Sequence, residues 1–153
     1  MAGSRRRLAI TEAGGYMRIA LIVLLFAYIV LSALPPAFAA IFQITDWRPR
    51  GADPAQVALF LSYGGWRFAL LAAPPLIYAV ALSGLIARRG FAVLALVGGL
   101  LVDLARRATD VFFSPAYAAA VTPQERVADL AVLLAPLLIA YMMVALRRRG
   151  VLT

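Results

Sequence analysis

Four apolar runs divide this chain, and each is long enough to cross a lipid bilayer. They cover residues 19–42, 57–87, 91–113 and 127–146. A helix needs about 20 residues to cross roughly 30 Å of hydrocarbon. Backbone groups cannot stay unpaired in lipid, and no run alternates like a barrel strand, so the runs predict helices. We therefore predict one all-α domain over residues 1–153, a four-transmembrane-helix bundle with helices near 16–42, 54–88, 90–113 and 123–148.

The composition supports a membrane protein and excludes several kinds of site. Hydrophobic residues make up 64% of the chain and charged residues 14%, against about 45–50% and about 25% in soluble domains. Cysteine and histidine are both absent, which removes disulfides, thiolate sites, the usual haem and zinc ligands, and the base of serine hydrolases. No catalytic sequence motif occurs either. We expect no cofactor, no metal site and no enzymatic activity.

The arginines predict how the helices are oriented. Nine of them, against Glu12 alone, lie at one set of helix ends: Arg5, Arg6, Arg7, Arg18, Arg88, Arg89, Arg147, Arg148 and Arg149. The opposite ends are balanced in charge, so the positive-inside rule places both termini in the cytoplasm. The net charge of +8 is thus explained by orientation, and we expect no nucleic-acid partner. Lysine is absent, as in proteins from GC-rich bacterial genomes, which favours a bacterial inner membrane.

Two segments between the runs have the pattern of a helix start. Residues 53–56 and 122–125 each combine a capping residue, a proline and then Gln or Glu, which is typical of a capping box. The runs that follow also resemble each other. This similarity indicates either two tandem helical hairpins or chance likeness between Ala- and Leu-rich helices. Pro35–Pro36, Pro74–Pro75 and Pro136 are expected to kink their helices.

The first run also resembles a secretory signal, because Ala37-Phe38-Ala39 imitates a cleavage site. However, Arg7 lies more than ten residues before the apolar core, and that core is long for a signal. We expect the segment to remain attached as the first helix, with cleavage as the alternative.

The third run carries a stripe of charges. Asp103, Arg106, Arg107 and Asp110 have the spacings i, i+3, i+4 and i+7, which place them within one sector of a helix and allow them to pair. The opposite face is apolar. Because a charge at the centre of a membrane helix costs about 2.5–3.5 kcal/mol on insertion scales, we expect the stripe to face the inside of the bundle.

Other helices offer partners for the stripe. Arg67 is predicted at similar depth in the second helix, where Tyr63 and Tyr78 share its face, and Arg126 and Asp129 begin the fourth helix. The predicted polar network is thus Arg67, Asp103, Arg106, Arg107, Asp110 and Asp129, with Tyr63 and Tyr78 beside it. Three interpretations remain open: an ion-pair network that fixes the helices, a contact site for a partner subunit, and an ion, proton or anionic-ligand site.

The short loops leave little mass outside the membrane for soluble partners. We therefore expect a non-catalytic accessory or structural subunit, or an assembly factor, of a larger membrane complex. Its partners would be the lipid bilayer and either other membrane subunits or further copies of this chain. The alternative is a small oligomeric ion or solute transporter or channel component that uses the stripe as its polar path.

Overall fold

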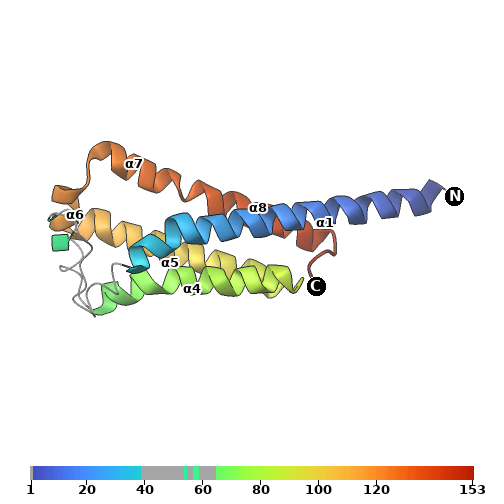
Figure 1. Cartoon of the computed structure of the whole chain (residues 1–153), viewed down its shortest axis with the longest axis horizontal. Helices are drawn as coiled ribbons and strands as arrows, with labels where there is room; N and C mark the ends of the chain where they lie inside the picture. The colour runs from blue at the N-terminus through green and yellow to red at the C-terminus, as the bar shows by residue number, and fades with distance from the viewer. Residues whose placement is uncertain (1, 39–53, 55–56, 59–64) are drawn as a thin grey trace.

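A computed structural model describes residues 2–38, 54, 57–58 and 65–153 of this chain, and all regular structure in that part is helical. The elements are α1 (Ala2–Tyr28), the π-helical turn η1 (Ile29–Ala33), α4 (Gly65–Ile86), α5 (Phe91–Phe113), α6 (Pro115–Ala120), α7 (Pro123–Ala131) and α8 (Leu134–Arg148). The long helices run side by side along the molecule, and both chain ends lie toward the same end of it (Figure 1).

Three helical segments are long and apolar enough to cross a membrane, which agrees with the prediction of an all-helical chain with membrane-spanning helices. They are Gly14–Phe38, Gly65–Ile86 and Pro123–Arg148. Large apolar side chains also cover the outside of the bundle, with Leu31 75%, Leu94 69% and Phe112 77% exposed. Extensive exposed apolar surface of this kind is rare in soluble monomers and is expected where lipid surrounds the protein.

The helix boundaries differ from the predicted ones at two places. The first helix begins at Ala2 instead of near residue 16, because Arg, Leu, Ala and Glu favour helix beyond the apolar run that set the prediction. The third predicted helix, 90–113, corresponds closely to α5. The fourth is divided into α7 and α8 by a turn at residues 132–133. Residues 39–42 and most of 54–64 lie outside the described part.

Proline accounts for the irregular helix segments. In η1, the Leu34 amide donates to the carbonyl of Ile29, five residues earlier. Pro35 and Pro36 follow directly and have no amide hydrogen to continue the α-helical ladder, so the preceding turn widens. Pro136 likewise lies in the first turn of α8, just after the division between α7 and α8.

The core lies between α1, α4, α5 and α8. Its fully buried side chains include Leu21, Leu25, Tyr78, Leu85, Leu96 and Met143. The most extensive packing joins α4 to α5, while α1 packs on α8 and α4. Tandem hairpins would pair the first helix with the second and the third with the fourth, so they do not describe the dominant packing.

The two short helices, α6 and α7, lie at the end of the molecule away from both chain termini, and each begins with a side-chain cap. The predicted capping box of α7 is confirmed: the Thr122 amide donates to Oε2 of Glu125 at 2.8 Å, and the Glu125 amide donates to Oγ1 of Thr122 at 3.3 Å. At the start of α6, the Tyr117 amide donates to Oγ of Ser114. The other predicted box, at residues 53–56, lies outside the described residues apart from Pro54.

Candidate functional site

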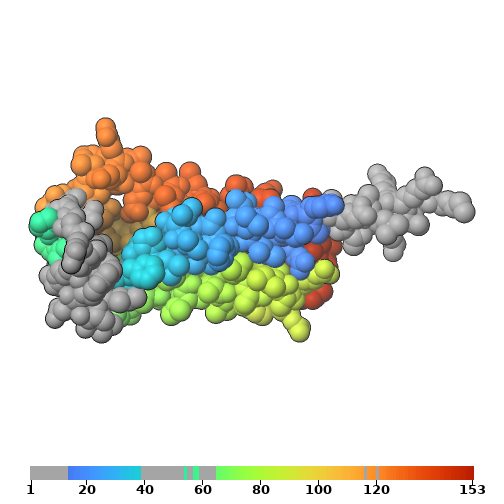
Figure 2. All heavy atoms as spheres, in the orientation of Figure 1, coloured from blue at the N-terminus to red at the C-terminus, as the bar shows by residue number. Residues whose placement is uncertain are grey.

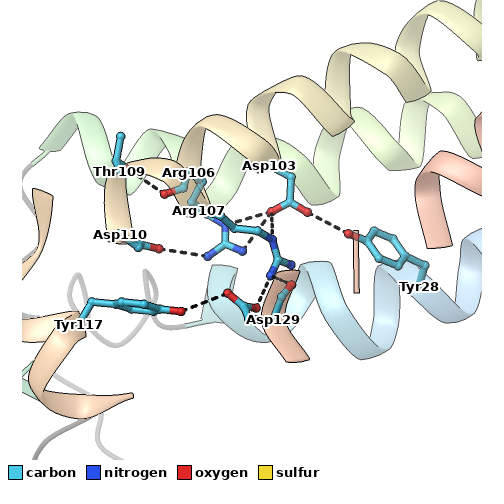
Figure 3. Close-up of polar contacts among 8 residues, drawn as sticks. All are labelled: Tyr28, Asp103, Arg106, Arg107, Thr109, Asp110, Tyr117 and Asp129. Carbon is cyan, nitrogen blue, oxygen red and sulfur yellow. Dashed lines mark hydrogen bonds and ion pairs between the residues drawn. The ribbon is translucent and has the colours of Figure 1, made fainter. Parts of the chain in front are cut away.

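A continuous polar network joins α5 to α1 and α7 (Figure 3). Asp103, Arg106, Arg107 and Asp110 lie on one face of α5, and all four are buried, with Asp103 only 3% exposed. The opposite face of α5 is apolar and exposed. The helix therefore turns its charges into the bundle, as its periodicity predicts.

Asp103 is the centre of this network. Its Oδ1 accepts hydrogen bonds from Nε and Nη2 of Arg106 at 3.1 and 3.0 Å, and lies 3.4 Å from Nε of Arg107. Its Oδ2 accepts a hydrogen bond of 2.9 Å from the hydroxyl of Tyr28 on α1. One carboxylate thus meets two guanidinium groups and a phenol. Both of its oxygens are occupied by donors from this chain.

Arg106 lies between two carboxylates of its own helix. Besides its bonds to Asp103, its Nη1 donates to Oδ2 of Asp110 at 3.4 Å. The hydroxyl of Thr109 donates to the Arg106 carbonyl at 2.7 Å. These i,i+3 and i,i+4 contacts hold the guanidinium along the helix surface.

Arg107 extends away from α5 to α7. Its Nη1 donates to the carboxylate and to the backbone carbonyl of Asp129. The Tyr117 hydroxyl donates to the other carboxylate oxygen of Asp129 at 3.4 Å. Burial raises the pKa of Tyr117 above its ordinary value, and the charge of Asp129 raises it further, so the phenol stays protonated as a donor. The Asp129 side chain is 38% exposed, which makes it the outermost carboxylate of the network.

Tyr78 lies beside the network without an ion pair of its own. Its ring meets that of Tyr28 edge to face, with the ring centres 5.3 Å apart, a favourable arrangement for aromatic pairs. Gly99 of α5 allows this ring to approach, because a Cβ at Gly99 would lie 2.8 Å from the Tyr78 ring. The α4–α5 contact thus packs Tyr78 against Tyr28, the residue whose hydroxyl donates to Asp103.

Arg67 and Arg126 each donate to a backbone carbonyl near the end of a helix. Nη2 of Arg67 donates to the carbonyl of Phe113 at 2.9 Å, at the end of α5. Nη2 of Arg126 donates to the carbonyl of Ala118 at 2.8 Å, at the end of α6. Cations at these positions interact favourably with the free carbonyls and the dipole of a helix end. Tyr63 lies outside the described residues.

Sequence reasoning missed two members of the network. Tyr28 was not named as a partner, although it follows Leu21 and Leu25 at spacings of seven and three residues. That spacing places its phenol on the buried face of α1, where a hydroxyl needs a partner. The sequence around Tyr117 gives no sign that its hydroxyl pairs with Asp129.

The arrangement is suited to holding helices in place. Each carboxylate of the network accepts at least one hydrogen bond from a guanidinium, and the chain of contacts runs from Tyr28 through Asp103 and Arg107 to Asp129. Among the described residues, no three acidic side chains gather as they would around a metal ion. Comparison of the chain with family models, curated proteins and solved structures finds no match.

Proposed function

We propose that this chain is a four-helix integral membrane protein of a bacterial inner membrane, with both termini in the cytoplasm. Helix α5 is the fourth crossing, beside the three more apolar ones. Its length of 23 residues supports this, as do its inward charges and its apolar outer face. The arginines near both chain ends and at the α4–α5 turn lie at one end of the bundle, which is then the cytoplasmic end.

Within that membrane, the protein acts as a non-catalytic accessory subunit or assembly factor of a larger complex. The observation that carries this proposal is the pairing of Asp103. A carboxylate that is 3% exposed and already accepts from Arg106 and Tyr28 has little capacity left for a substrate. The network therefore serves the bundle itself, and recognition falls to the outer surface of the helices.

Helix α7 is the best candidate for that recognition surface. None of its residues is buried, and Val127 and Leu130 are 69% and 50% exposed. In Figure 1 the short helix α7 diverges from the long helices, while Arg107 reaches across to it. A helix held by an ion pair but not packed into the core presents its remaining faces to a partner within the membrane.

Site-specific photocrosslinking in native membranes tests this proposal. A benzophenone side chain at Val127 or Leu130 should capture a membrane protein of discrete size. The control is the same group at Leu76 of α4, which is 68% exposed and should capture mainly lipid. If all three positions give the same pattern, or if mild detergent releases only a monomer without adducts, α7 is not a docking surface and the subunit proposal fails.

A second candidate function is ion or solute transport, which one observation favours. The half-exposed Asp129 is linked through Arg107 to the buried Asp103, so charged groups continue from the surface into the bundle. Broken helices beside such groups are a feature of transporters. Flux through proteoliposomes that Asp103→Asn abolishes would support transport, whereas no flux above that of protein-free vesicles would leave the subunit proposal preferred.

A further inference from the structure

The α4–α5 turn contains an arginine in a backbone conformation that normally selects glycine. Arg88 has φ of 58°. The Arg89 amide donates to the Gly84 carbonyl at 2.8 Å, and the Arg88 amide donates to the Leu85 carbonyl at 3.4 Å. These two bonds form a Schellman motif, in which the left-handed residue is usually glycine because a Cβ is disfavoured there.

Helix α8 ends in the same motif with the usual residue. Gly150 has φ of 72°, its amide donates to the Arg147 carbonyl, and the Val151 amide donates to the Leu146 carbonyl. The two helix ends thus differ at the one position where glycine is favoured. A strained residue that the surrounding structure maintains is a reason to look for a function of its side chain.

Backbone contacts hold these two helix ends together. The Thr153 amide donates to the Arg88 carbonyl at 2.8 Å, and the Gly90 amide donates to the backbone oxygen of Thr153 at 2.6 Å. The Arg147 side chain lies against this turn, since a Cβ on Gly90 would be 3.6 Å from its Nε. These backbone hydrogen bonds hold Arg88 and Arg89 beside the end of α8.

The resulting surface is strongly basic. Five exposed arginines gather on it: Arg88, Arg89, Arg147, Arg148 and Arg149. The ion pairs of Asp103, Asp110 and Asp129 are made by Arg106 and Arg107 and involve none of these five arginines. Figure 2 shows the end of α4 and the C-terminal residues together at this end of the bundle. An anion is the complementary ligand.

The apolar neighbours of the turn indicate where that anion lies. Ile86 and Phe91, which flank the turn, are 56% and 47% exposed, so lipid chains are expected to reach this level and the arginines to meet the headgroups just beyond. We propose that Arg88, Arg89 and Arg147 bind the phosphate of an acidic phospholipid headgroup. The planar guanidinium suits phosphate because it donates two parallel hydrogen bonds, and juxtamembrane arginines favour anionic lipid.

Arg88→Gly separates this role from a structural one. It removes the charge and also the backbone strain, so the variant should unfold at a higher temperature in detergent yet bind less lipid. The measurement is native mass spectrometry of the full chain with equimolar phosphatidylglycerol and phosphatidylcholine. We expect wild type to retain phosphatidylglycerol preferentially, and Arg88→Gly to lower its affinity about fivefold. Arg89→Gln is a second variant with the same expected loss of binding.

Arg126→Gln is the matched control, because it removes one positive charge at the opposite end of the bundle and should leave phosphatidylglycerol binding unchanged. Equal retention of the two lipids would overturn the proposal. So would wild-type binding by Arg88→Gly and Arg89→Gln, or an equal loss in Arg126→Gln. Complete competition by millimolar inorganic phosphate would also overturn it, since the ligand would then be free phosphate.

Discussion

Replacing Asp103 by asparagine tests the ion-pair network most directly. Asparagine keeps the size of the side chain but removes its charge. The guanidinium groups of Arg106 and Arg107 would then lose the carboxylate that lies 3.0 and 3.4 Å from them. The hydroxyl of Tyr28 would also meet an uncharged group in place of its present acceptor. All three neighbours would remain buried, so water could not replace the lost partner.

The size of the effect follows from these contacts. Removing one partner of a buried ion pair typically costs about 3–5 kcal/mol, whereas a hydrogen bond between membrane helices averages about 0.6 kcal/mol. Asp103→Asn should therefore lower the free energy of unfolding by about 3 kcal/mol or more. Tyr28→Phe removes only the phenol donor and should cost about 1 kcal/mol. The difference between the two losses measures the part of the stability that depends on the charge of Asp103.

The assay is equilibrium unfolding in mixed micelles with increasing dodecyl sulfate, followed by the fluorescence of the two tryptophans. A combined apolar replacement completes the test, and it must include Asp129 because Arg107 pairs with it. The combined variant replaces five residues with apolar ones: Asp103, Arg106, Arg107, Asp110 and Asp129. This variant should recover most of the stability that Asp103→Asn loses, since apolar groups of similar volume can substitute for buried ion pairs. If Asp103→Asn costs no more than Tyr28→Phe, the network does not hold the bundle together.

Three further predictions concern the backbone and its caps. Gly99→Ala should lower the unfolding free energy by about 1–3 kcal/mol through overpacking, because its Cβ would lie 2.8 Å from the Tyr78 ring. A Cβ at Gly98 has no neighbour within 4 Å, so Gly98→Ala should be neutral or slightly stabilising. The same dodecyl sulfate titration compares the two variants. Gly150→Ala should cost about 1–2 kcal/mol because its φ of 72° disfavours a Cβ, and an unchanged midpoint would contradict that conformation. Thr122→Ala should remove about 1 kcal/mol of helix stability, seen as faster proteolysis within α7, and Thr122→Ser should keep wild-type resistance.

Features that depend on one helix at a time could be predicted from the sequence. The spacing of Asp103, Arg106, Arg107 and Asp110 determines that they share a face of any α-helix. The capping box of Thr122 and Glu125 is likewise a pattern within one short segment. Both statements need only the period of the helix and the chemistry of its termini.

Contacts between helices could not be derived in the same way. Whether Asp129 meets Arg107 or Arg67 depends on the direction in which α7 leaves α8, and so on the turn at residues 132–133. The choice of Tyr28 as the partner of Asp103 depends on how α1 rotates against α4 and α8. Hydropathy does not determine these angles. The sequence therefore indicates which charges share the network but not which of them pair.

The composition of α5 also has a consequence for how the bundle assembles. Each charge would cost about 2.5–3.5 kcal/mol at the centre of a membrane helix and less toward its ends, so an isolated α5 would be costly to place in lipid. Its exposed leucines offset only part of this cost. The helix becomes acceptable only when its charges pair and its polar face is covered. Its most extensive packing is against α4, directly before it in the chain, while Tyr28 and Asp129 complete the network from α1 and α7. In the four-helix arrangement proposed above, α4 is thus the main cover of α5, while the hydrogen bond from Tyr28 and the ion pair with Asp129 position α1 and α7 against it.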